Sequence, residues 1–296
     1  MKQHTGHHEQ LSISQNYFKN TLNTSHHWSF SWCRETAQNA VDAGATQIDY
    51  TITAKNKQTI ELSVTDNGKG MSLTTLTNDL LTLGGSSKYS HYAGQSKHIN
   101  TGTSHGYAKN IILFAHSRYQ IHSRNTVVKG KGQQYRLEAT AHYRQGTTLS
   151  ITTQTSQNNA LMQFRQNCRI LAYHYQTPLT ITLNGKPLNY RQERFKHQLT
   201  LPLCTLSFNA TIANDETTVS YWVKLAKLPL FNRIQYSSGN YNIDGILDLN
   251  KEASHLLTAN HEGFEPETAQ LLYSLFNELS HQGSRINEIK QNNKTG

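Results

Sequence analysis

The stretch SWCRETAQNAVDA, residues 31–43, contains the first side chains that could do chemistry. Glu35 and Asn39 are four residues apart in it, so a helix would stack them one turn apart on one face. A carboxylate and an amide placed in this way can bind the same ligand. Pairs with this spacing are common on exposed helices, so the pair alone does not indicate a site.

A second group lies in the segment DNGKGM, residues 66–71. Asp66 ends a strand-like run, and Gly68 and Gly70 let the backbone turn closely against a flat or anionic group. An ordinary Asn-Gly hairpin turn is the alternative interpretation. It is disfavoured because leucines at helical spacing follow, so the segment joins a strand to a helix and not to a second strand.

The glycine-rich segment GTSHGYAK is the third group and opens a predicted helix at 105–115. Amides at such a helix start can receive phosphate oxygens, with Lys88 and Lys109 as counter-charges. The candidate phosphate-binding residues are Lys88, Gly102, Thr103, Ser104, His105, Gly106, Tyr107 and Ala108. The spacing Gly-x-x-x-x-Gly-Lys-Ser/Thr is absent, as is a strand-bound Gly-x-Gly-x-x-Gly, so the sequence excludes P-loop and Rossmann sites.

The dipeptide Gly146-Thr147 lies between two strand-like runs, where the hydroxyl of Thr147 could reach a bound base or its water. On its own the dipeptide carries no information. The order of the four groups along the chain does, because each occurs in the secondary structure that its chemistry needs.

Periodicity predicts the elements that must position these groups. A helix at 31–43, an antiparallel hairpin at 48–64 and a helix near 73–83 come first. Residues 84–103 lack periodicity and are expected to form a lid, and strands then continue to about residue 155. This order predicts an α+β fold, with helices on one face of a mixed, mostly antiparallel sheet.

The chain is expected to divide into five parts. They are a polar N-terminal arm at 1–27 with one short helical turn near Tyr17 and Phe18, a first domain at 28–155, a connecting helix at 156–175, a smaller strand-rich α+β domain at 176–283 that ends in a helix, and a tail at 284–296. The pair Asn184-Gly185 predicts a hairpin where the strand-rich domain begins.

Composition bounds the partners and the compartment. There are 28 Lys and Arg against 19 Asp and Glu, a net charge of +9 that attracts polyanions but, being scattered, does not single out nucleic acid. Three distant cysteines favour a reducing compartment over a disulfide framework. The longest apolar run, 111–115, is too short to cross a bilayer, so a cytoplasmic protein without a membrane partner is expected.

In this order the four groups resemble the GHKL superfamily, the Bergerat-fold ATPases that include DNA gyrase, the large heat-shock chaperone, sensor histidine kinases and MutL. RETAQNAVDAGA is similar to the family's N-box, DNGKGM to its G1 box, GTSHGYAKN to its G2 box and GTTLSI to its last motif. The resemblance covers residues 28–153. It implies a Bergerat-type α/β sandwich that binds ATP and Mg²⁺.

The resemblance also implies roles for individual residues. Glu35 would be the general base that orients and deprotonates water, and Asn39 would hold Mg²⁺. Asp66 would bind the adenine amino group, supported by Thr147 through a water. The other family positions would shape the pocket, with Gly68, Gly70 and Met71 around the base, and Gly102, His105 and Gly106 around the phosphates.

Three further features refine the resemblance. Thr103 and Ala108 replace glycines of gyrase-like members, which bears on phosphate affinity. No phosphoacceptor helix precedes the domain, which disfavours a sensor histidine kinase. The strand-rich domain resembles the family's transducer domain in position, with Lys224, Lys227 and Arg233 as candidates to reach the terminal phosphate, and LTANHEGFEPE weakly resembles phage-encoded rIIA-like GHKL proteins.

The sequence therefore predicts a slow, Mg-dependent ATPase whose nucleotide state closes the lid and promotes homodimer formation. The alternative is a nucleotide-binding module that does not hydrolyse ATP and contacts DNA or a protein partner through a basic second domain. Phosphotransfer to a protein substrate is a third hypothesis.

Overall fold

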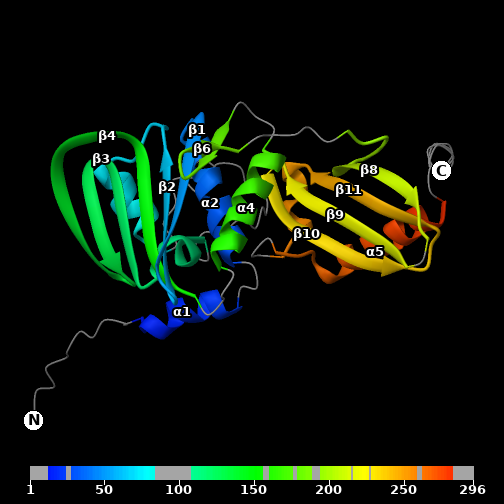
Figure 1. Cartoon of the computed structure of the whole chain (residues 1–296), viewed down its shortest axis with the longest axis horizontal. Coiled ribbons are helices and arrows are strands. Elements are labelled where there is room, and N and C mark those ends of the chain that lie inside the picture. Colours follow the sequence, from blue (N-terminus) through cyan, green and yellow to red (C-terminus); the bar gives the residue numbers. More distant parts are fainter. Residues whose placement is uncertain are drawn as a thin grey trace, which may run out of the picture.

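The computed structural model describes residues 13–24, 28–83, 108–155, 160–175, 179–188, 194–214, 216–226, 228–258 and 262–282 of the 296-residue chain. These residues form two units, each built around one β-sheet, with helix α4 (Ala160–His174) between the two sheets (Figure 1).

The first unit has a six-stranded sheet in the order β3-β4-β2-β1-β5-β6. All neighbouring strands are antiparallel except β1 and β5, which run parallel. The strands are β1 (Gln47–Asn56), β2 (Thr59–Asp66), β3 (Arg118–Lys131), β4 (Gln134–Gln154), β5 (Thr180–Leu183) and β6 (Lys186–Pro187). This mixed, mostly antiparallel sheet confirms the predicted α+β fold.

Apolar alternation determines which face of this sheet is covered. Ile48, Tyr50 and Ile52 of β1 are buried and alternate with more exposed residues, so they share one face. Helices α2 (Trp28–Asp42) and α4 pack against that face, where the rings of Trp32 and Phe164 lie 6.3 Å apart. The core therefore fixes α2, the helix that carries Glu35 and Asn39.

Helix α1 (Gln15–Thr24) is longer than the single turn predicted near Tyr17 and Phe18. Phe18 is buried, and its ring lies 5.7 Å from that of Phe114. The stretch is polar apart from a few residues, so the sequence predicted only one turn. The buried side chain of Phe18 docks the helix on the core.

Two predicted helical stretches contain π-helices, η1 (Thr75–Leu80) and η3 (Asn110–Phe114). Their wider turns are closed by bonds that span five residues, such as Leu81 N to Leu76 O at 2.9 Å. Apolar spacing predicts that these segments are helical but does not distinguish an α-turn from a π-turn.

The hairpin at Asn184-Gly185 forms as predicted, but in the first sheet. Strand β5 pairs in parallel with β1, and its Ile181 is buried in the first core. Helix α4 connects β4 to β5. The second sheet therefore begins in β7 at His197, later than the residue 176 expected from the sequence.

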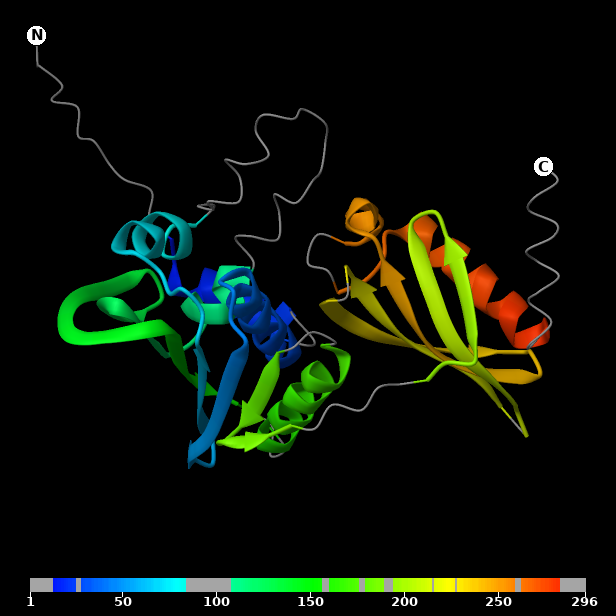
Figure 2. The same ribbon diagram turned by 90° about the horizontal axis from the view of Figure 1, so that it is seen from above.

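The second unit has a five-stranded sheet in the order β10-β9-β11-β8-β7, in which β9 and β11 run parallel. Its strands are β7 (His197–Leu201), β8 (Cys204–Ile212), β9 (Thr217–Leu225), β10 (Leu228–Ser237) and β11 (Tyr241–Leu249), followed by the 3-10 helix η4 (Lys251–Leu256). Helix α5 (Pro266–Gln282), predicted from its leucine stripe, lies along one face of this sheet (Figure 2), where Phe276 stacks on Tyr221 at 4.1 Å.

Helices α2 and α4 also contact the second unit. The ring of Trp222 lies 5.6 Å from Phe30 of α2 and 4.7 Å from His174 at the end of α4. The helix that carries Glu35 therefore belongs to the interface between the units. No helix in the described part of the chain combines the length and apolarity needed to cross a bilayer.

Candidate active site

Helix α2 presents Glu35 and Asn39 on its accessible side. The other side is anchored to β1, because the Tyr50 hydroxyl donates to the Cys33 carbonyl at 2.7 Å and lies 3.1 Å from the Thr36 hydroxyl. The Glu35 side chain is 25% exposed and Asn39 is exposed. Both members of the predicted pair are thus open to a ligand on a helix that the core holds in place.

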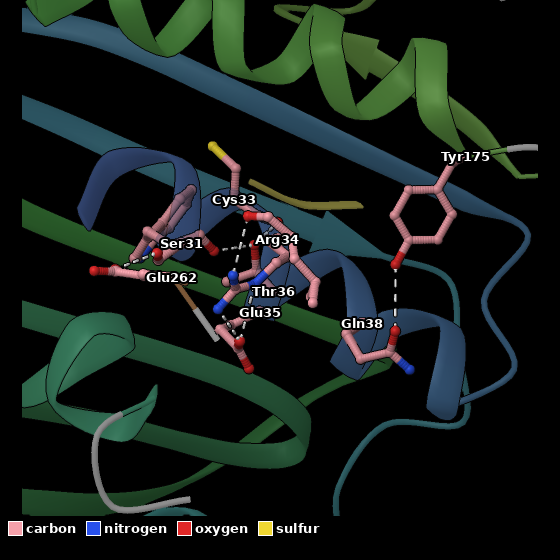
Figure 3. A network of polar contacts seen from close by, with 10 residues as sticks. Ser31, Cys33, Arg34, Glu35, Thr36, Gln38, Tyr175 and Glu262 are labelled. Carbon is pink, nitrogen blue, oxygen red and sulfur yellow. Dashed lines mark hydrogen bonds and ion pairs between the residues drawn. The ribbon is translucent and has the colours of Figure 1, made fainter. Parts of the chain in front are cut away.

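Arg34 holds one oxygen of the Glu35 carboxylate (Figure 3). Its Nε and Nη2 donate to Glu35 Oε1 at 3.1 and 2.8 Å, and its Nη1 donates to the Leu230 carbonyl of β10 at 3.3 Å. Within the described residues, no group donates a hydrogen bond to Oε2 of Glu35. The carboxylate therefore has one oxygen held by Arg34 and one without a donor among these residues.

Asp66 ends β2, and backbone amides fix its carboxylate. Gly68 N donates to Asp66 Oδ1 at 2.8 Å, and the Thr147 amide donates to the same carboxyl group. Burial raises the pKa of Asp66, while these two amides and the nearby charge of Arg144 act in the opposite direction. A half-buried, oriented carboxylate of this kind can accept a hydrogen bond from an amino group.

Hydrogen bonds join the end of α2 to the turn after Asp66. Lys69 N donates to the Ala43 carbonyl at 3.0 Å, and Asn67 Oδ1 accepts from the amides of Thr46 and Gln47 at 2.9 and 3.0 Å. Hydrogen bonds therefore join the helix that carries Glu35 and Asn39 to the turn that begins at Asp66.

Ser123 of β3 is a site residue that the sequence did not reveal. Its fully buried hydroxyl accepts from Met71 N at 2.7 Å, donates to the Gly146 carbonyl at 3.0 Å and lies 3.0 Å from the Thr147 hydroxyl. It thereby connects the segment after Asp66 to Gly146-Thr147. The one available signal was its alternation with the apolar Ile121 of the same strand.

Gly70 and Gly146 are glycines because their backbones lie against each other and against Asp66. Both have positive φ, 66° and 73°. A Cβ on Gly146 would lie 2.0 Å from the Asp66 carbonyl oxygen, and one on Gly70 would lie 2.8 Å from the Gly146 oxygen. The close backbone approach at this site requires glycine at both positions.

Residues 33–170 match the family model of the histidine kinase-, DNA gyrase B- and HSP90-like ATPases. The matched range runs from within α2 to within α4, so it contains Glu35, the Asp66 turn and Gly146-Thr147. The chain contains a GHKL-type ATPase domain. No curated protein sequence matches the chain.

Most of the glycine-rich box of this GHKL domain lies outside the described residues, as do Lys88 and all candidates from Gly102 to Tyr107. Ala108 is described and is half-buried against the core. Lys109, expected as a counter-charge for phosphate, donates through Nζ to the carbonyls of Asp79 and Thr82. It therefore links the start of η3 to the end of η1, the two described elements that flank residues 84–107.

The three cations considered for the terminal phosphate have different positions. Lys224 is buried, and its Nζ donates to the His174 carbonyl at 3.1 Å, at the end of α4. Arg233 is exposed on β10, and Lys227 lies outside the described residues. The structure thus brings Lys224 to the interface with the GHKL domain, at α4, whereas Glu35 lies on α2.

A polar cavity of about 330 Å³ opens at the other face of the GHKL sheet. Its lining residues are Gln47, Asp49, Thr65, Asp66, Asn67, Arg144 and Gln145. Gln47 and Asp49 alternate with buried residues of β1, so they point away from the face that α2 covers. The cavity meets the predicted site only at Asp66 and includes neither Glu35 nor Asn39.

Proposed function

We propose that the chain binds ATP with Mg²⁺ and hydrolyses it slowly. The main support is the network that connects α2, the Asp66 turn and Gly146-Thr147, since it holds Glu35 and Asp66 in a fixed relation. A base for water and an acceptor for adenine, held on one rigid frame, are two of the groups that such a reaction needs from the protein.

Glu35 would act as the general base. Because Arg34 holds Oε1, Oε2 can take a proton from water while the water oxygen bonds to the terminal phosphorus and the bond to the departing ADP breaks. Asp66 would accept from the adenine amino group, Thr147 would support Asp66, and Gly68, Gly70 and Met71 would surround the base.

Asn39 would supply an oxygen ligand to Mg²⁺, which would neutralise charge on the phosphates when bound. The Asn39 side chain is exposed one helical turn from Glu35, and an amide oxygen is a hard ligand of the type that Mg²⁺ accepts. Mg²⁺ commonly takes one or two protein ligands and completes its shell with phosphate and water, so a single amide suffices.

ATP affinity and turnover of Glu35→Gln and Asp66→Asn, measured beside the wild type, test this proposal. Glu35→Gln is expected to keep nucleotide affinity and to lose about 10²-fold or more in turnover, the usual contribution of a general base. Asp66→Asn is expected to lose affinity. Glu61→Gln, an exposed carboxylate on β2, is the control and should behave as the wild type. A wild-type protein that binds no nucleotide would contradict the proposal.

We further propose that ATP closes the predicted lid at 84–103 and promotes dimer formation, as the sequence led us to expect. The support is the place of this stretch in the chain between η1 and η3, two elements of the GHKL domain. Light scattering with and without a slowly hydrolysed ATP analogue tests it, and an unchanged mass in both conditions would contradict it.

Nucleic-acid binding is the second candidate, and the charge distribution favours the β3–β4 hairpin over the second unit. Residues 118–154 contain six Lys and Arg against one acidic residue, whereas residues 194–282 contain six against nine. Tyr135 and Tyr143 of the hairpin are exposed and could stack on bases. Titration with single-stranded DNA at low and high salt tests this candidate. Undetectable binding, or binding that added salt does not weaken, would exclude it.

A further inference from the structure

We infer that Arg34 is a positioning residue that couples the Glu35 carboxylate to the second unit, an inference that rests on the proposed role of Glu35 as general base. One edge of the guanidinium, Nε and Nη2, donates to Glu35 Oε1, and Nη1 donates to the Leu230 carbonyl. A single side chain thus bonds to Glu35 of the ATPase domain (Figure 3) and to the backbone of the second sheet.

The contact between Arg34 and Glu35 is not one that a helix provides by itself. Adjacent residues of an α-helix point in different directions, and it is residues three or four apart that face each other. Arg34 must therefore curve around α2 to reach its neighbour. Its burial, with 3% of the residue exposed, and its bond to Leu230 hold it in that conformation.

The neighbouring contacts show that the N-terminal half of α2 docks on the second unit at several points. The Ser31 hydroxyl donates to Glu262 Oε1 at 3.1 Å, and Phe30 packs on Trp222. Leu230 is itself buried, at a β-bulge of β10 between Pro229 and Phe231, which pair with β9 on either side of it. The carbonyl that receives Arg34 therefore belongs to the backbone of the second sheet, with paired residues on either side.

This arrangement makes turnover sensitive to the position of the second unit. The bond from Nη1 to Leu230 is 3.3 Å long, at the long end of the hydrogen-bond range, so a shift of the sheet toward α2 tightens it and a shift away breaks it. Loss of the bond removes one of the contacts that keep the guanidinium against Glu35 Oε1. The carboxylate then loses the orientation that points Oε2 at the attacking water.

Arg34→Lys is the first test, because lysine keeps the charge but cannot contact Glu35 and Leu230 with a planar fork. ATP affinity should stay near the wild-type value while turnover falls about tenfold or more, since small misplacements of a catalytic group cost up to about 10²-fold. Ser31→Ala is the matched control, because it removes another bond between α2 and the second unit without touching Glu35. It should lower turnover much less than Arg34→Lys does.

Trp222→Leu provides a second measurement, because it loosens the second unit without altering Arg34 or Glu35. It should lower turnover in the wild-type background and have little further effect in the Arg34→Lys background, since both changes would break the same link. Fully additive effects would overturn the inference, as would wild-type turnover in Arg34→Lys. If the wild type and Glu35→Gln hydrolyse ATP equally, the proposed function itself fails.

Discussion

At the scale of single residues, one buried hydroxyl connects three parts of the candidate site. Ser123 satisfies the Met71 amide and the Gly146 carbonyl, and it contacts Thr147. The chain thus stabilises the part of the site around Asp66 by a buried residue of a neighbouring strand.

Ser123→Ala should therefore reduce both stability and ATP affinity. It leaves a partly buried amide and a buried carbonyl without the serine hydroxyl, which costs about 1–3 kcal/mol for an unsatisfied group. Thermal or chemical denaturation and nucleotide titration measure the two effects. Ser150→Ala removes a hydroxyl of the same sheet that bonds only to Ser63 among the described residues, and is expected to change affinity little. Equal affinities in all three proteins would contradict the proposed role.

The sequence predicted the site residues that belong to a recognisable local pattern. Asp66 is followed by two glycines, and Glu35 is followed by an amide one helical turn later, so both patterns are local. Ser123 and Arg34 act through partners more than 50 residues away, such as Met71 and Leu230. A single sequence does not contain that pairing, because it arises only when the sheet and the two units assemble.

At the scale of elements, α1 contributes an unexpected part of the first core. Its buried Phe18 packs on Phe114 of η3, the helix that begins directly after the glycine-rich box. The position of η3 therefore depends partly on a helix that comes some 90 residues earlier in the chain.

Phe18→Ala should destabilise the protein by about 3–5 kcal/mol, the usual cost of truncating a buried phenylalanine. Chemical denaturation at neutral pH measures it. Tyr17→Ala is the control, because the neighbouring tyrosine is 58% exposed and its truncation removes little buried surface. If both variants lose the same small amount, α1 does not dock on η3 in solution.

The spacing of apolar residues predicted which segments form helices and strands better than it predicted which strands pair with each other. The hairpin of β1 and β2, the strand β3, and the helices α4 and α5 agree with their apolar patterns. The two runs predicted on either side of Gly146-Thr147 instead form one strand, β4. The assignment of β5 and β6 to the first sheet did not follow from any pattern, because an Asn-Gly turn fixes a hairpin but not the strand beside it. The π-turns of η1 and η3 likewise depend on packing.

At the scale of the whole molecule, the interface between the units contains a buried, titratable group. His174 ends α4, packs on Trp222 and lies near the ammonium of Lys224, whose Nζ binds the His174 carbonyl. Burial lowers the pKa of His174 to about 3, and the charge of Lys224 acts in the same direction. The imidazole is therefore neutral in the folded protein at neutral pH.

Acidification should lower the free energy of unfolding through His174. In the unfolded chain His174 binds a proton near pH 6.5, so its contribution to stability is fully present above that pH and is lost as the pH falls toward 3. At pH 5 the loss is about 2 kcal/mol, since each pKa unit corresponds to about 1.4 kcal/mol.

Denaturation of the wild type and His174→Gln at pH 7 and pH 5 measures this loss. The difference between the two pH values should shrink by about that amount in the variant. Part of it should remain, because His116, buried in the first core with a pKa lowered to about 4, changes stability in the same direction. An unchanged difference would mean that the interface around His174 opens to water before the protein unfolds.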